Sequence, residues 1–257
     1  MAAFLASTVG SWLVLRGMSF FGDAFVHGVI PGIAAAVVLD VNPILGAAVA
    51  AAIMIAAIEI VQRATSLSAD TSIGLLFVGM LALGVVIVSQ MDSYSGNLTS
   101  ILFGDALGIS SVDIVSQAIL LIVVILVSAI LYRPLLALSL SPEKAALLGM
   151  KPRITHFVLL GLIAVAVIGS FQSLGTLLVF GLLVGPPATA SLFSKTVLSM
   201  MLISALFGSF SVWLGLVISF YWETAASATM AIIPIILFFL ALTVRYLARW
   251  VRSRIRS

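Results

Sequence analysis

Residues 43–61 read PILGAAVAAAIMIAAIEIV, a run of nineteen residues that contains one charged side chain, Glu59. At 1.5 Å per residue, a helix of this length crosses a hydrocarbon core about 30 Å thick. Apolar residues occur all along the run instead of forming one amphipathic stripe. The stretch therefore indicates a transmembrane helix.

The same pattern recurs along the chain. At fifteen residues, the first apolar run is too short to cross a bilayer comfortably, so we expect either that it lies partly in the interface or that this chain begins later than its relatives do. We predict an all-α polytopic membrane protein, a single domain over residues 1–257, with about eight to nine transmembrane helices. The candidate spans are 1–15, 20–39, 43–61, 71–90, 112–131, 154–170, 175–193, 197–220 and 226–244.

The composition excludes several classes of protein. Apolar residues make up 63% of the chain and charged residues 8%, against about 25% charged in soluble domains. Cysteine is absent, which excludes disulfides, thiolate metal ligands and cysteine catalysis. The chain has no Gly-x-x-x-x-Gly-Lys-Ser/Thr, HExxH or GxSxG motif, so we expect neither an enzyme nor its own ATP site. A net charge of +3 forms no basic face for nucleic acid.

The cations predict an orientation in the membrane. With nine spans, all twelve Lys and Arg residues fall on one side, five of them in the tail 245–257. By the positive-inside rule the C-terminus is cytoplasmic, and the Arg-rich tail lies beside anionic headgroups. The opposite loops contain acids and no cation: Asp40, Asp92, Asp105 and Glu223.

The longest inward loop, about 133–153, contains the segment SPEKAALLG. Ser141 is a typical N-cap, Pro142 suits the first helical position, Glu143 suits the first turn and Gly149 suits the end of a short helix. Such a helix on the cytoplasmic face suits a permease that receives force from a soluble partner. A plain connector helix is the alternative.

Asp23 and His27 are the most informative ionisable residues, because such groups inside a span are costly and usually functional. A spacing of four places them on one helical face, about 6 Å apart at Cβ. Carboxylate oxygen and imidazole nitrogen suit Mn²⁺, Fe²⁺ or Zn²⁺ better than Cu⁺. Two ligands are too few for a metal site, but a twofold dimer would supply four. The alternative is an Asp–His hydrogen bond that caps the span.

Small residues and proline follow this pair. Gly28 and Gly32 form a GxxxG pair that permits close helix approach, and Pro31 should kink the helix. Broken helices near the bilayer centre are where transporters place binding sites. Packing alone is the alternative.

A second stretch, residues 172–190, also combines small residues with proline. It predicts a helix break at Pro186 and Pro187, followed by small residues that include Thr189. A tight, kinked helix of this kind suits a translocation pathway. It suits a buried interface helix equally well.

The segment LVLRGMSFFGDAFVHGVIPGIA, residues 13–34, resembles the signature of the ABC-type manganese/zinc/iron uptake permeases. The Asp-x-x-x-His and Pro-Ala-Thr-Ala elements are its specific parts, and the matches span residues 13–190 in the family's order. The other matching segments are DTSIGLLF (70–77), ILFGD (101–105), SPEKAALLGM (141–150) and SLGTLLVFGLLVGPPATA (173–190).

The resemblance implies the transmembrane subunit of a metal importer in the bacterial cytoplasmic membrane. Two permease copies, a homodimer, would pair with two copies of a cytoplasmic ATPase that binds ATP. An extracytoplasmic metal-binding protein would deliver manganese or zinc, possibly iron, as cargo and not as a resident cofactor. Asp23 and His27 would line the pathway. The ATPase would couple through the short inward helix, whose coupling residues would be Ser141, Glu143, Lys144 and Gly149.

Two departures from the family pattern are visible. Val26 stands where the family usually has Ser before the His, and family members carry further residues before this start. The alternative function is a single-chain secondary metal transporter or channel, although the few buried acids argue against ion coupling. An intramembrane metalloenzyme ranks last because a third ligand and a general base are missing.

Overall fold

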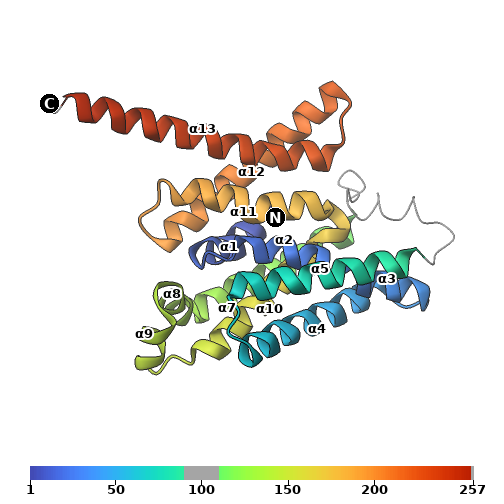
Figure 1. Cartoon of the computed structure of the whole chain (residues 1–257). Coiled ribbons are helices and arrows are strands. Elements are labelled where there is room, and N and C mark those ends of the chain that lie inside the picture. Colours follow the sequence, from blue (N-terminus) through green and yellow to red (C-terminus); the bar gives the residue numbers. More distant parts are fainter. Residues whose placement is uncertain (90–109, 256–257) are drawn as a thin grey trace.

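The computed structural model describes residues 1–89 and 110–255, and these residues form helices and turns without a β-strand. The predicted all-α class is confirmed. Figure 1 shows the helices running side by side in one bundle. Seven of the described helices are long and apolar enough to cross a membrane: Ser19–Val38, Pro43–Ala64, Asp70–Val88, Ser111–Ile130, Pro152–Ser170, Val197–Trp222 and Ala226–Ala248.

Every predicted span corresponds to helical structure in the described residues. The runs 1–15 and 175–193 form helices shorter than a span, so the count of eight to nine stays a prediction. The elements are α1 (Ala2–Leu15), α2 (Ser19–Gly28), α3 (Ile30–Val38), α4 (Pro43–Ala64), α5 (Ala69–Val88), α7 (Ser111–Ile130), α8 (Tyr132–Leu140), α9 (Pro142–Leu147), α10 (Pro152–Leu174), α11 (Thr176–Ser191), α12 (Val197–Trp222) and α13 (Ala226–Ile255).

Helix α1 lies inside the bundle instead of at its surface. Leu5, Val9, Trp12 and Leu13 are at most 1% exposed, and α1 packs against α7, α10, α11 and α12. The expectation that the first run lies partly in the interface is therefore wrong.

The break expected at Pro186 and Pro187 is absent, since α11 continues through both prolines. Pro187 cannot donate to the carbonyl of Leu183, four residues earlier. Helix α1 covers this carbonyl, because a Cβ at Gly10 would overlap the Leu183 oxygen. Such a close approach supports a Cα–H···O contact. Both prolines are therefore accommodated within α11, where the backbone of α1 lies close to the Leu183 carbonyl.

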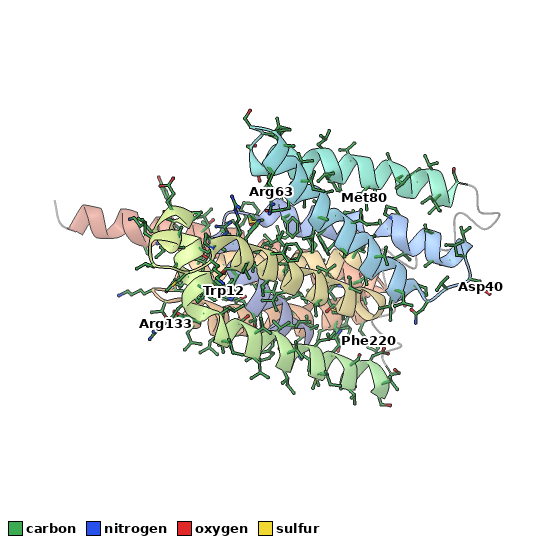
Figure 2. All side chains as sticks on the ribbon, turned by 90° about the horizontal axis from the view of Figure 1, so that it is seen from below. Trp12, Asp40, Arg63, Met80, Arg133 and Phe220 are labelled. Carbon is green, nitrogen blue, oxygen red and sulfur yellow. The ribbon has the colours of Figure 1, made fainter. Side chains whose placement is uncertain are left out.

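The charged ends of the bundle agree with the loop assignment made from the sequence. Figure 2 shows Arg63 and Arg133 toward one end and Asp40 at the opposite end. Helices α8 and α9 lie at the Arg133 end (Figure 1). Two of the predicted outer acids, Asp92 and Asp105, lie outside the described residues, as does the motif at 101–105.

Candidate functional site

Asp23 and His27 lie together on one face of α2. Nε2 of His27 is 3.5 Å from Oδ1 of Asp23, and the two side chains are 24% and 30% exposed, respectively. A strong N–H···O hydrogen bond spans about 2.7–3.2 Å, so the pair is set wider than a good hydrogen bond. The N-cap of α2 is Met18, without a side-chain cap. Asp23 therefore does not cap the helix, although an i,i+4 pair with His27 within α2 remains the structural alternative to a metal site.

The separation of the two donor atoms suits chelation of one ion. Two donors that each lie about 2.1 Å from a tetrahedral metal are about 3.4 Å apart. Within residues 1–89 and 110–255, however, no group of three or more His, Cys, Asp or Glu side chains could hold a metal. In the part of the chain that the structure describes, Asp23 and His27 are thus two neighbouring donors and not a complete coordination shell.

A break in the helix places His27 near the middle of its span. Helix α2 ends at Gly28, Val29 lies in a turn, and α3 begins at Ile30 with a proline in its first turn. Pro31 has no N–H to donate to the carbonyl of His27, four residues earlier. In the span Ser19–Val38, His27 is the ninth of twenty residues. The sequence alone left the depth of the pair open.

The glycines near the site allow the close packing that the sequence predicts. A Cβ at Gly32 would overlap the carbonyl oxygen of Gly46, and a Cβ at Gly46 would overlap the carbonyl oxygen of Gly32. The backbones of α3 and α4 are therefore in reciprocal contact. A Cβ at Gly28 would meet the sulfur of Met54, also in α4. The predicted close approach is confirmed.

Aromatic side chains form an apolar wall beside Asp23 and His27. The ring of His27 lies 6.1 Å from that of Phe77 in α5, and Phe77 is in edge contact with Phe20. Phe21 and Phe25 fill the buried side of α2. Low-polarity walls strengthen electrostatic attraction, so the carboxylate acts on a nearby cation more strongly here than in bulk water.

The second predicted pathway segment does not share this site. Helices α2 and α11 meet where Gly22 contacts Leu183, whereas Pro186 lies against Gly208 of α12. Thr189 is fully buried, and its hydroxyl donates to the Gly185 carbonyl at 2.9 Å within α11. A pathway role for Pro186, Pro187 and Thr189 stays a prediction.

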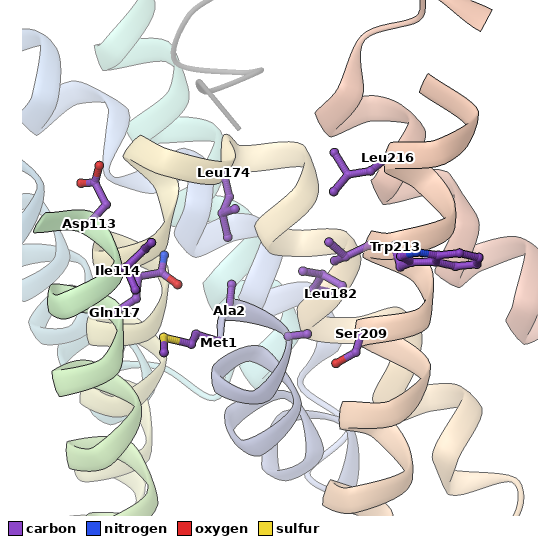
Figure 3. Close-up of a pocket in the computed structure, with 12 residues that line it drawn as sticks. Met1, Ala2, Asp113, Ile114, Gln117, Leu174, Leu182, Ser209, Trp213 and Leu216 are labelled. Atoms are coloured by element: carbon purple, nitrogen blue, oxygen red, sulfur yellow. The ribbon is translucent and has the colours of Figure 1, made fainter. Parts of the chain in front are cut away.

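An apolar pocket at the N-terminal end of α1 is also separate from Asp23 and His27. It has a volume of about 530 Å³ and is lined by residues of α1, α7, α11 and α12, among them Gln117 and Trp213 (Figure 3). Neither Asp23 nor His27 lines it. Its mostly apolar lining is unsuited to a divalent ion.

The short inward helix is present as α9. The hydroxyl of Ser141 accepts from the N–H of Lys144 at 3.3 Å, and Glu143 lies in the first turn. At the other end Gly149 has a φ of +71°. The N–H of Gly149 donates to the carbonyl of Ala146, and the N–H of Met150 donates to the carbonyl of Ala145. These two bonds form a Schellman motif. The predicted capping is confirmed, and the coupling role stays a prediction.

Arg16 is a polar residue of this end of the bundle that the sequence reasoning did not single out. Its Nη1 donates to the carbonyl of Leu138 at 2.7 Å, and its Nη2 lies 3.4 Å from Nδ1 of His156. Burial lowers the pKa of Arg16, although a guanidinium remains protonated at any ordinary pH. The sequence signal that could have indicated this role is the position of Arg16 directly before Gly17, at the end of a predicted helix.

The chain is similar to known proteins over almost its whole length. The model of the ABC 3 transport family matches residues 1–245. The chain belongs to this family. It is 35% identical over 252 residues to the manganese import system permease protein ScaB of Streptococcus gordonii, covering 96% of this chain and 90% of that protein. It is 32% identical over 238 residues to the high-affinity zinc uptake system membrane protein ZnuB of Haemophilus influenzae, covering 93% and 91%.

Solved structures of transporters share the architecture of this ABC 3 family chain. The structure of PsaBC from Streptococcus pneumoniae in complex with Fab superposes with a TM-score of 0.82 at 30% identity, covering 93% of this chain and 86% of that one. A putative metal-chelate type ABC transporter in an inward-facing conformation gives a TM-score of 0.70 at 17% identity and covers 94% and 84%. The second match shows the fold alone. The chain is thus a multi-pass transport subunit.

Proposed function

We propose that residues 1–257 form one permease domain that carries a divalent transition metal, manganese or zinc, into the cell. The observation that carries the proposal is the pair Asp23 and His27, set 3.5 Å apart beside a helix break near mid-span. An oxygen and a nitrogen donor suit both metals. Relatives named for manganese and for zinc support the same cargo.

A homodimer would complete the site. Two copies of Asp23 and His27 around a twofold axis supply four donors, as a tetrahedral ion requires. Both side chains are about a quarter exposed, and Phe20 beside them is 44% exposed, so this face of α2 is open to a second chain. Ions held by few protein ligands are also easier to release, as transport demands.

The partners follow from the two ends of the bundle. Helix α9 lies at the end with Arg133, and its Leu147 is 88% exposed, which suits docking of a cytoplasmic ATP-binding subunit. That subunit binds ATP, because this chain has no P-loop motif. The C-terminus lies on the same, cytoplasmic side. An extracytoplasmic metal-binding protein would dock at the opposite end, where Asp40 lies.

Uptake of radioactive manganese or zinc into proteoliposomes that contain the complete importer tests the site. We expect Asp23→Ala and His27→Ala each to lower uptake at least tenfold, since loss even of groups that support a metal ligand costs about 10–100-fold. Asp70→Asn is the matched control, because Asp70 is an exposed acid in the first turn of α5 to which the proposal gives no role in metal binding. Wild-type uptake in both site variants would disprove the assignment.

The energy source separates the importer from the single-chain alternative. Uptake by the importer requires ATP and the ATP-binding subunit. Metal uptake by the permease chain alone, driven by an ion gradient, would instead establish a secondary transporter and refute the proposal.

A further inference from the structure

The corner that joins α1 to α2 is held by backbone hydrogen bonds. Gly17 has a φ of +66°, its N–H donates to the Val14 carbonyl at 3.0 Å, and the N–H of Met18 donates to the Leu13 carbonyl at 3.1 Å. This Schellman motif ends α1 directly after Arg16, and α2 begins after Met18. A short, hydrogen-bonded corner therefore connects Arg16 to the helix that carries the metal ligands.

The side chain of Arg16 completes a bond that α8 cannot make itself. A continuing helix would satisfy the Leu138 carbonyl with the N–H of residue 142, but Pro142 has none. Leu138 is 2% exposed, so a carbonyl without a partner there would be costly. Arg16 supplies the donor at 2.7 Å, and its positive charge suits the C-terminal end of a helix.

Arg16 also contacts the helix on the other side of α9. Nδ1 of His156, in α10, lies 3.4 Å from Nη2 of Arg16. A guanidinium only donates, so Nδ1 accepts and the neutral ring carries its hydrogen on Nε2. Helix α8 precedes α9 and α10 follows it, so one side chain contacts both helices that flank the α9 segment.

We propose that Arg16 is a positioning residue that transmits displacement of α9 to the metal-binding helix α2. This inference rests on the proposed function. Within α9 only Ala145 is buried, so a partner that presses on the exposed surface moves the ends of α8 and α10. Arg16 holds those ends and begins the corner into α2. Asp23 follows seven residues later in the chain, as the fifth residue of α2.

The experiment measures metal ions transported per ATP hydrolysed by the complete importer in proteoliposomes. We expect Arg16→Gln to lower this ratio about tenfold, the effect of losing one strong charge-assisted contact. Hydrolysis of ATP should continue, because the partner's site is untouched. Arg63→Gln is the matched control: Arg63 has a side chain 64% exposed and pairs with Glu59 near the same end. This control should keep the wild-type ratio.

Two further variants separate positioning from a general structural role. Arg16→Lys retains a donor for Leu138 but cannot reach Leu138 and His156 together, so its ratio should lie between those of Arg16→Gln and wild type. His156→Gln removes only the contact to α10 and should lower the ratio less than Arg16→Gln. If Arg16→Gln does not assemble, these two variants decide the question.

Several results would overturn the inference. A wild-type ratio in Arg16→Gln would do so, and so would a parallel fall in hydrolysis and uptake. If the Arg63→Gln control lowered the ratio as much as Arg16→Gln does, the effect would come from loss of any positive charge at this end of the bundle. Failure of the proposed metal site would give a different result from failure of this inference. If the site assignment is wrong, Asp23→Ala still transports metal, and the ratio of metal transported to ATP hydrolysed can still be measured in the Arg16 variants.

Discussion

The reciprocal contact of Gly32 and Gly46 allows one prediction to be worked out in detail. In Gly32→Ala the new methyl group overlaps the carbonyl oxygen of Gly46 and lies against the Cβ of Ala50. A backbone oxygen cannot rotate away as a flexible side chain can. Helices α3 and α4 must therefore separate by about 1 Å to restore van der Waals contact.

Overpacking of this kind costs about 1–3 kcal/mol in a close-packed interior. For a chain of this size each kcal/mol lowers the melting temperature by roughly 2–4 °C, so we expect Gly32→Ala to melt about 2–12 °C below wild type. The assay is thermal unfolding of the purified protein in detergent, followed by loss of the monodisperse peak in size-exclusion chromatography.

Gly79→Ala is the matched control for this experiment. It makes the same change within α5, where a Cβ would meet no heavy atom within 4 Å. Alanine favours a helix over glycine by about 1 kcal/mol, so this variant should melt at or slightly above the wild-type temperature. If Gly32→Ala had the same melting temperature as Gly79→Ala, the close contact between α3 and α4 would be refuted.

Three further predictions concern other parts of the chain. Ser110→Ala removes the capping box with Asp113 at the start of α7 and should cost about 1 kcal/mol, seen as a lower melting temperature; no change would contradict the cap. Glu59→Gln breaks an exposed ion pair with Arg63 and should change the free energy of unfolding by less than about 1 kcal/mol. A larger loss of stability would show that this pair contributes more than an ordinary surface ion pair. Gly149→Ala places a Cβ at a φ of +71°, should distort the end of α9 and should lower the metal transported per ATP; unchanged coupling would remove α9 from the mechanism.

Local chemistry in the sequence predicted the helices and their ends well. Apolar runs of bilayer length became helices because lipid leaves backbone groups no other partner. The cap at Ser141 and the end at Gly149 follow from side-chain hydrogen bonding and positive φ, which depend on a few neighbouring residues. The spacing of Asp23 and His27 likewise placed both on one face.

Features that depend on distant residues were not predictable in this way. The two prolines of α11 should break a helix by local rules, but Gly10 brings α1 against the carbonyl of Leu183 and the helix continues. The contact of Arg16 with Leu138 joins positions 122 residues apart. Only the missing N–H of Pro142 hinted that the Leu138 carbonyl needed an outside donor.

The turn at Val29 divides one membrane span into α2 and α3, which both pack on α4 and α5. Helix α3 is in close contact with α4 through the paired glycines, whereas α2 also packs on α10 and α11 and begins after the corner at Arg16. Val29 is therefore the point along this span at which α2 can change its direction relative to α3. If Arg16 transmits a displacement as proposed, the displacement reaches Asp23 and His27 before this turn, because both residues lie in α2.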